Sequence, residues 1–317
     1  MPNLIAIAFA DLHAHKFRSF DKPPGRLYWC LDVLREIADI AADKNVDVLF
    51  AGDLLHNPKE VENQTMSKLI KTYNYQFERR GVLFLAISGN HDMSEKNSID
   101  HQSPSHLHSF DHFKTFECID NDWMQCRGYV VAGIPYYNND KDVVMTEQVL
   151  WKKVKDTKGL KILLVHGDFP GAKTNTGYRV KETEYLNHAT FKNWDLVLSG
   201  HIHKRQQLAK NMYMLGAPLH IDTGDIGNKC GYWKIYDDAT VQFKELIGFP
   251  RFTRETPKNP IDYYVAPEQL SSESEVKLGE FSLLTDRTKL ARKYCALKNI
   301  KSKAKKRALI EILNNPE

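Results

Sequence analysis

Apolar runs that each end at a chemically reactive side chain dominate the first two thirds of the chain. Five of these runs have the length and composition of buried β-strands. An aspartate, asparagine or histidine follows each run within three residues. The pattern therefore predicts one functional site built at the ends of several strands. The runs are Leu4 to Ala10, Val46 to Phe50, Val82 to Ile87, Lys161 to Val165 and Leu196 to Leu198.

Between these strands, apolar residues recur every three or four positions, which predicts amphipathic helices. The clearest patterns run from Leu27 to Ala41 and from Met66 to Phe77, and a third helix is predicted over Asp140 to Lys155. The order strand, helix, strand, helix, strand predicts a doubly wound α/β opening. Open α/β sheets bind their ligands beyond the carboxyl ends of the strands, which is where the reactive side chains fall.

Predicted strands and helices alternate less regularly in the second half of the chain. A strand is predicted over Gly128 to Ile134, and short runs at Met212 to Leu215, Cys230 to Tyr236 and Val241 to Ile247 predict antiparallel strands. The stretch from Ser94 to His112 has no clear period, so we expect a loop near the site. We predict an α/β fold with two packed mixed β-sheets flanked by helices and a C-terminal helical extension.

We predict three parts along the chain: a catalytic domain over residues 1–249, a linker or small capping segment over 250–285, and a basic helical tail over 286–317. Four prolines between Pro250 and Pro267 indicate the linker. The tail holds ten Lys or Arg residues against three acidic ones, so its net charge is 10 − 3 = +7 and that of the remainder is 4 − 7 = −3. Lys-rich helices are often only solvated, but the apolar edge at Leu309, Ile310 and Leu313 indicates a docking face.

Composition limits the compartment and the ligand chemistry. No window approaches 18 consecutive apolar residues, so no membrane span is expected. The N-terminal run is too short for a signal core, and we expect a cytoplasmic protein. The five cysteines include no Cys-x-x-Cys pair, which fits a reducing compartment and argues against thiolate zinc.

The side chains at the strand ends form a ligand set for divalent manganese, iron or zinc. Two ions need a shared ligand, and a carboxylate can bridge them, which is the role we assign to Asp53. His201 and His203 are two apart in an extended segment, so they project to one side. We assign Asp11, His13 and His203 to one ion, and Asn90, His166 and His201 to the other.

In their order, these residues resemble the five signature blocks of the calcineurin-like metallophosphoesterase superfamily. The blocks are Asp11-Leu12-His13, Gly52-Asp53, Gly89-Asn90-His91-Asp92, His166 and Gly200-His201-Ile202-His203. With the strands that follow them, they cover about residues 1 to 247. His15 departs from the superfamily pattern, since many members carry Gly there.

One branch of the superfamily is more similar than the others. His56 stands where the common pattern has a second Asp, which resembles SbcD-like nuclease subunits of the meiotic-recombination-eleven type. Leu215 to Pro218 and Lys229 to Trp233 also resemble that branch. The short length is similar to that of bacteriophage members.

The resemblance implies a DNA exonuclease or endonuclease subunit of a double-strand-break repair or recombination complex. Two divalent ions, Mn²⁺ first among them, would activate a hydroxide that attacks the phosphodiester. We expect His91 to supply a proton to the leaving group, Asp92 to orient His91, and His56 to assist at the substrate phosphate. The implied partners are DNA and an SbcC-like ATPase subunit that binds the tail, and a homodimer through Leu27 to Ala41 is an open alternative.

Two other functions stay open at this point. A protein phosphatase or cyclic-nucleotide phosphodiesterase would use the same scaffold and ligands. A catalytically idle, partner-binding protein is disfavoured, because no ligand position is missing. The remaining histidines favour structural or solvated roles; they are His101, His106, His108, His112, His188 and His220.

Overall fold

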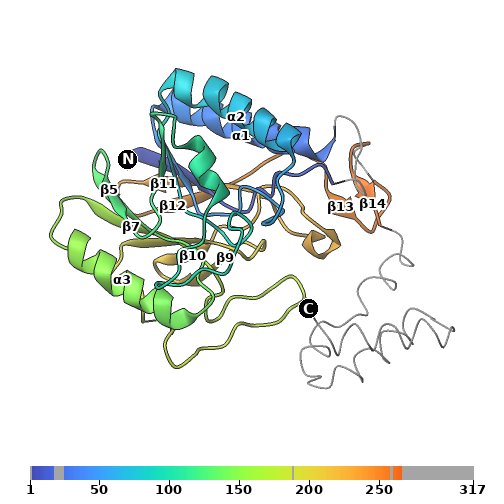
Figure 1. Cartoon of the computed structure of the whole chain (residues 1–317). Coiled ribbons are helices and arrows are strands. Elements are labelled where there is room, and N and C mark those ends of the chain that lie inside the picture. The colour runs from blue at the N-terminus through green and yellow to red at the C-terminus, as the bar shows by residue number, and fades with distance from the viewer. Residues whose placement is uncertain (1, 18–24, 188, 258–259, 266–317) are drawn as a thin grey trace, which may run out of the picture. The chain divides into compact units, whose positions relative to one another are not determined.

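Two six-stranded sheets, covered by helices, form the structure, which is a computed structural model (Figure 1). It describes residues 2–17, 25–187, 189–257 and 260–265. The chain divides into two units at Tyr264, and the first contains every described helix and strand. The predicted tail over 286–317 and most of the predicted segment over 250–285 lie outside the described residues.

The first sheet has the strand order β12-β11-β1-β2-β3-β4. Its central strands β1 to β4 are parallel, and β11 and β12 add an antiparallel edge. The parallel strands are short and almost wholly apolar, as expected for strands covered on both faces. The bounds are β1 (Leu4–Phe9), β2 (Asp47–Phe50), β3 (Phe84–Ala86), β4 (Phe116–Cys118), β11 (Gly231–Tyr236) and β12 (Val241–Glu245).

The second sheet has the order β5-β6-β7-β8-β10-β9. Strands β6, β7, β8 and β10 are parallel, and β5 and β9 pair antiparallel at the edges. The bounds are β5 (Trp123–Gln125), β6 (Tyr129–Ile134), β7 (Leu160–His166), β8 (Leu196–Gly200), β9 (Gln206–Ala209) and β10 (Met212–Met214).

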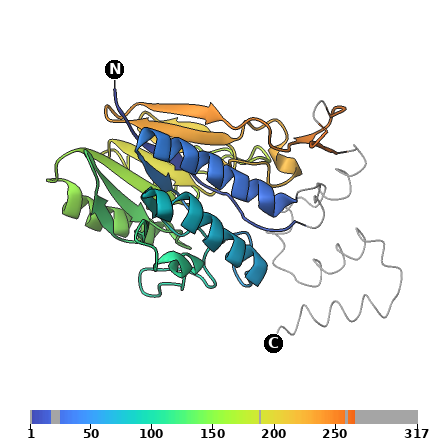
Figure 2. The ribbon, with the colours of Figure 1, turned by 90° about the horizontal axis from the view of Figure 1, so that it is seen from above.

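Helices cover only the outer face of each sheet, so the layers run helix, sheet, sheet, helix (Figures 1 and 2). Helices α1 (Arg26–Lys44) and α2 (Asn63–Gln76) pack on the first sheet, and α3 (Asp140–Val154) packs on the second. The predicted two-sheet α/β fold is confirmed. The predicted doubly wound opening is wrong, because the inner face of the first sheet packs on the other sheet rather than on helices.

The alternation of side chains along β1 illustrates how the layers are held together. Ala6 and Ala8 point into the core between the sheets, where the second sheet contributes residues such as Leu164. Ile7 and Phe9 point to the other side, into the core beneath α1 and α2. Small residues on the inner face let the two sheets approach closely, while large ones fill the space under the helices.

Elements that the sequence did not predict are short or lie at edges. Strands β4, β5 and β9 have three or four residues each, with partly exposed polar positions. A two-stranded sheet, β13 (Phe252–Thr253) with β14 (Tyr263–Tyr264), follows β12. No helix in the described part of the chain is long and apolar enough to cross a bilayer.

Candidate metal centre

The carboxyl ends of strands from both sheets meet at one place. Asp11 and His13 follow β1, and Asp53 follows β2. Asn90 and His91 follow β3, the imidazole of His166 ends β7, and the segment from His201 to His203 follows β8. Because the sheets stack with these ends on the same side, residues almost 200 positions apart become neighbours; for example, the His201 N–H donates to Asp11 Oδ1 at 2.8 Å.

One half of the cluster surrounds the amide oxygen of Asn90. Asn90 Oδ1 lies 2.9 Å from His201 Nδ1 and 3.2 Å from His166 Nε2. His166 Nε2 also lies 3.4 Å from Asp53 Oδ2. Asn90, His166 and His201 are the three side chains predicted for one metal ion, and the structure brings them together.

The other half surrounds the imidazole of His13. His13 Nε2 lies 3.2 Å from His203 Nε2 and 3.5 Å from Asp53 Oδ2. Donor atoms of Asp11, His13 and Asp53 all lie within 4.8 Å of one another. Asp53 Oδ2 is therefore within 3.5 Å of a nitrogen from each half, which is the position that a bridging carboxylate needs.

Three observations of this structure fit a divalent cation. Asp11 Oδ2 is buried and has no hydrogen-bond partner within the described residues, although buried carboxylate oxygens are normally satisfied. Imidazole nitrogens face one another and carboxylate oxygens, a mixture that suits manganese, iron or zinc. Asp11, His13, Asp53 and His201 have φ angles of 56°, 49°, 60° and 92°, and such strained backbone gathers at functional sites.

A hydrogen bond at the far side of one ring and an ion pair at the far side of another present their Nε2 atoms to the cluster. His166 Nδ1 donates to the Ala51 carbonyl oxygen at 2.7 Å. His203 Nδ1 lies 3.7 Å from Asp225 Oδ2. A ring that holds its proton on Nδ1 keeps a lone pair on Nε2, so both rings are oriented as metal ligands.

Asp225 is a site residue that the sequence did not reveal. It is 1% exposed, and its carboxylate accepts hydrogen bonds from the Ile221 N–H at 2.7 Å and the Asn175 side chain at 2.7 Å. Burial raises the pKa of Asp225, but the hydrogen bond from His203 and its charge outweigh this and hold the pKa well below the ordinary value. No periodic strand leads to Asp225; the only local signal is the Asp-x-x-Asp capping box around a short 3-10 helix, Thr223–Asp225.

The prediction that Asp92 orients His91 is wrong. Both oxygens of the buried Asp92 carboxylate accept backbone N–H groups, from Asp53 at 2.7 Å and from Leu55 at 3.0 Å. Asp92 therefore holds the loop after β2 against the loop after β3. The His91 ring is oriented instead by the backbone carbonyl oxygen of His56, to which Nδ1 donates.

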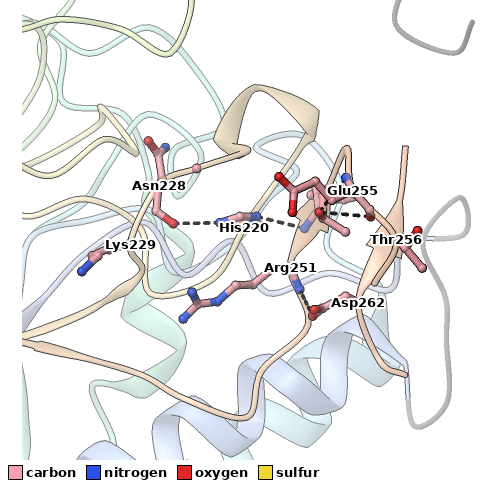
Figure 3. A pocket seen from close by; sticks show the side chains of 10 residues that line it. His220, Asn228, Lys229, Arg251, Glu255, Thr256 and Asp262 are labelled. Atoms are coloured by element: carbon pink, nitrogen blue, oxygen red, sulfur yellow. Dashed lines mark hydrogen bonds between the residues drawn. The ribbon is translucent and has the colours of Figure 1, made fainter. Parts of the chain in front are cut away.

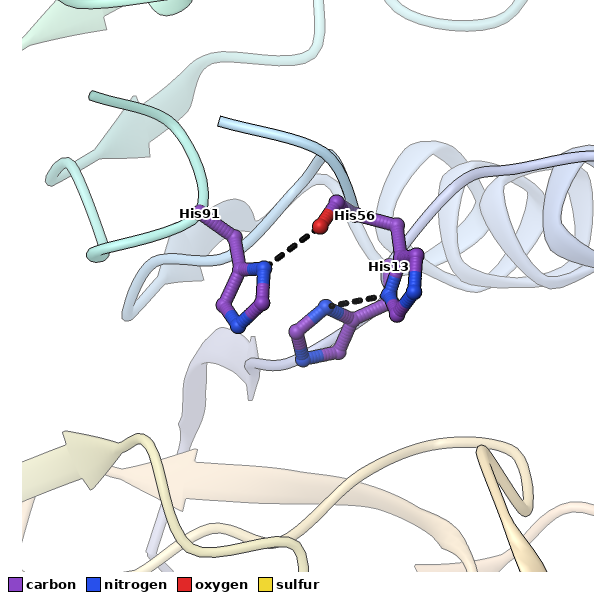
Figure 4. A group of neighbouring side chains, drawn as sticks. All are labelled: His13, His56 and His91. Carbon is purple, nitrogen blue, oxygen red and sulfur yellow. Dashed lines mark hydrogen bonds between the residues drawn. The ribbon is translucent and has the colours of Figure 1, made fainter. Parts of the chain in front are cut away.

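His56 lies beside both His13 and His91 (Figure 4). Its Nδ1 is 3.4 Å from His13 Nδ1, and the His56 and His91 rings are stacked with centroids 5.6 Å apart. Because His13 presents Nε2 to Asp53 and His203, its proton sits on Nδ1 and is donated to His56. His56 is thus placed to orient a ligand ring.

We expect His56→Ala to weaken metal binding about 10- to 100-fold, the usual effect of losing a partner that orients a ligand. Isothermal titration with Mn²⁺ would measure it, and His106→Ala, from a half-buried ring that bonds the Pro58 carbonyl, is the control. Unchanged affinity in His56→Ala would show that the contact with His13 has no orienting role.

Glycines leave room for the ligands to approach. A Cβ at Gly89 would overlap Asp53 Oδ1, and one at Gly200 would lie 2.8 Å from His166 Nδ1.

We expect Gly89→Ala to displace Asp53, with a cost of about 1–3 kcal/mol in stability and a loss of metal affinity. Thermal unfolding and metal titration would measure both. Gly81→Ala is the control, because no atom lies within 4 Å of its added Cβ although its φ is +67°; equal metal affinity in the two variants would contradict the steric argument.

The electrostatics of the cluster predict proton release on metal uptake. Burial lowers the pKa of His166, but the Asp53 carboxylate outweighs it and raises the pKa to about 9. Burial also lowers the pKa of His203, and the hydrogen bond to Asp225 with nearby carboxylates raises it to about 9. Both rings are therefore protonated at pH 7, and a cation binds only the neutral form. Calorimetry in buffers of different ionisation enthalpy should show about two protons released at pH 7 and none near pH 10, and a buffer-independent enthalpy at pH 7 would contradict this.

A pocket of about 340 Å³ is lined by His220, Asn228 and Arg251, among others (Figure 3). The side chain of His220 is buried, with 3% exposure. Nε2 of His220 donates to the Asn228 carbonyl oxygen, and Nδ1 accepts the Phe252 N–H, both at 3.0 Å. His220 therefore ties β13 to the segment that holds Asp225, which agrees with the structural role expected from the sequence.

A four-layer α/β sandwich with aspartate, asparagine and histidine gathered at its strand ends defines the metallophosphoesterase class. Residues 6–205 match the family described as calcineurin-like phosphoesterase, and the chain belongs to that family. This is the family that the motifs predicted.

Individual relatives are distant. An uncharacterized protein, R555, of Acanthamoeba polyphaga mimivirus is 28% identical over 210 residues, which are 64% of this chain and 15% of that protein. The chain thus spans only a small part of this relative. Among solved structures, a dimetal phosphatase from Danio rerio has a TM-score of 0.43 at 8% identity, covering 77% of this chain and 97% of that one. A hypothetical protein from Thermus thermophilus has a TM-score of 0.35 at 12% identity, covering 67% and 75%.

Proposed function

We propose that this phosphoesterase is a DNA nuclease, with exonuclease and endonuclease activity, that works in double-strand-break repair or recombination. Manganese is the metal we propose for it. The observation that carries the proposal is His56, an imidazole at the position where the resembled superfamily has a second aspartate, beside the rings of His13 and His91. A phosphodiester in a polymer presents an anionic oxygen there, and an imidazole N–H can donate to it.

In this proposal the seven predicted ligands are divided between two metal ions according to their contacts. Two divalent cations, when bound, neutralise charge on the phosphate and lower the pKa of a water molecule toward neutrality. Asp53 is shared between the two halves. Asp11, His13 and His203 would hold one ion, and Asn90, His166 and His201 the other.

His91 has the geometry to move a proton to the leaving oxygen. Its Nδ1 is engaged by the His56 carbonyl, so Nε2 is the atom left to face a substrate. The His91 ring centroid lies 4.7 Å from that of His13, and the His91 N–H donates to Asp53 Oδ1 at 2.8 Å. The side chain is therefore held against the metal ligands without belonging to either half.

The test compares three substrates with Mn²⁺ present: linear double-stranded DNA, a phosphopeptide and a cyclic nucleotide. We expect DNA to be degraded, EDTA to abolish the reaction, and His56→Ala to slow it. Binding to DNA should weaken steeply with salt, because phosphate contacts release counterions. Preferential hydrolysis of the phosphopeptide or the cyclic nucleotide would instead establish the phosphatase or cyclic-nucleotide phosphodiesterase alternative.

We further propose that the basic segment over 286–317 binds an SbcC-like ATPase subunit. Its net positive charge and the apolar edge at Leu309, Ile310 and Leu313 support this. Removing residues 286–317 should weaken partner or DNA binding and leave hydrolysis of bis(p-nitrophenyl) phosphate intact. Homodimerisation through α1 is a separate proposal that sedimentation would test.

A further inference from the structure

A hairpin in the long loop between β7 and β8 reaches the surroundings of the metal centre (Figure 1). It comprises residues 171–180, and Lys173 pairs with Arg179 across it. Backbone hydrogen bonds join its two arms, among them the bond from the Gly171 N–H to the Val180 carbonyl oxygen at 2.9 Å. These bonds make the hairpin one local unit.

Asn175 connects this hairpin to the carboxylate of Asp225. Asn175 Nδ2 donates to Asp225 Oδ1 at 2.7 Å, and Asn175 Oδ1 accepts the side-chain amide of Asn228 at 3.0 Å. The same Asn228 amide also donates to Asp225 Oδ1 at 3.0 Å. A Cβ at Gly224 would lie 3.4 Å from the Cβ of Asn175, so the 3-10 helix that ends at Asp225 packs closely against the hairpin.

The other oxygen of the Asp225 carboxylate faces the metal ligand His203. Oδ2 lies 3.7 Å from His203 Nδ1 and accepts the Ile221 N–H at 2.7 Å. Because both oxygens belong to one planar group, the bond from Asn175 to Oδ1 also sets the position of Oδ2. Asp225 is 1% exposed, so bulk water does not reach it to replace a lost donor.

We propose that Asn175 is a positioning residue for the metal ion that His203 binds, and that it couples this ion to the hairpin. Asn175 acts through Asp225, whose carboxylate orients the His203 ring as partners of metal-ligating histidines do. Such coupling is reciprocal, because a contact that strengthens metal binding is itself strengthened by bound metal, by the same factor. The inference rests on the division of ligands between two ions given under the proposed function.

A second contact holds the hairpin in place independently of Asn175. Gln206 Nε2 donates to the Lys173 carbonyl oxygen, and the Lys173 N–H donates to Gln206 Oε1, both at 2.8 Å. Gln206 begins β9, three residues after His203. Replacing Asn175 should therefore remove the link to Asp225 without detaching the hairpin.

The first test is isothermal titration of the full chain with Mn²⁺. We expect Asn175→Ala to bind one of two ions about tenfold more weakly than the wild type. The matched control is Thr176→Ala, which removes a side-chain contact of 2.9 Å with Thr174 inside the same hairpin and should leave both affinities unchanged. Wild-type affinities in Asn175→Ala would overturn the proposal and leave the division of ligands standing.

A double-mutant cycle tests whether the effect passes through Asp225. Asp225→Ala alone should weaken binding of one ion about 10- to 100-fold. Adding Asn175→Ala to that variant should then change nothing further, because residues that act through one another are not additive. Effects of the two substitutions that simply add would overturn the proposed route.

Hydrogen exchange gives a readout that is independent of activity and that the wild type alone can decide. Saturating Mn²⁺ should slow exchange of the hairpin amides of Thr174 and Val180 about tenfold in the wild type, and not in Asn175→Ala. Hairpin exchange that is identical with and without Mn²⁺ in the wild type would overturn the coupling, even if the variant fails to fold. A wild type that binds fewer than two ions would overturn the division of ligands, and this inference with it.

Discussion

Asp53→Asn is expected to abolish the binding of two metal ions and to reduce phosphodiester hydrolysis by at least about 1,000-fold. Asp53 Oδ2 lies within 3.5 Å of nitrogens from both halves of the cluster, so one substitution affects both ions. Asparagine has the same shape and can still accept the His91 N–H, which isolates the loss of negative charge. Metal analysis of the dialysed protein and hydrolysis of bis(p-nitrophenyl) phosphate would measure the two effects.

The same substitution at a surface aspartate provides the control. Asp156 has an 89% exposed side chain, and Asp156→Asn should leave metal content, activity and thermal unfolding unchanged. Asp53→Asn also removes the charge that faces the imidazoles of His13 and His166, so thermal unfolding is measured beside metal content. Two ions retained at wild-type affinity in Asp53→Asn would contradict the bridging role.

The ligands were predictable because each lies within four residues of a strand end. Parallel strands place their carboxyl ends on one edge, so the apolar runs before Asp11, Asp53 and Asn90 were enough to group these side chains. The identity of each polar residue then indicated the metal. The pairing of the two sheets, which brings β8 and His201 to the same edge as Asp11, followed from the family resemblance and not from the periodicity.

The supporting contacts were not predictable, because they depend on backbone positions that no pattern encodes. Asp92 was expected to face the adjacent His91, yet it accepts N–H groups from the β2 loop. Asp225 follows no strand and reaches His203 only because the 3-10 helix before β11 folds back over the site. Side chains that bond backbone groups across the fold have no regular spacing in the sequence. Ligands that follow successive strands do have such a spacing, so they can be predicted.

His91→Gln is expected to keep metal binding and to lose turnover by about 100- to 10,000-fold, the usual contribution of a general acid. The His91 ring is held by the His56 carbonyl and lies beside that of His13, and His91 is not one of the seven predicted ligands. Glutamine can replace the hydrogen bond to the carbonyl, and it has no proton that titrates near neutral pH. Metal titration and kcat for bis(p-nitrophenyl) phosphate separate binding from chemistry.

Two substrates whose leaving groups differ in their need for a proton test this prediction more stringently. p-Nitrophenolate leaves without needing a proton, whereas the alkoxide of a nucleotide requires one. The loss in His91→Gln should therefore be much larger for a DNA strand than for bis(p-nitrophenyl) phosphate. His56→Ala, which removes the contact with His13 and the proposed contact with the phosphate that both substrates contain, should lower both alike. Equal losses for the two substrates in His91→Gln would exclude proton donation, and the complete loss of one bound ion would place His91 among the ligands.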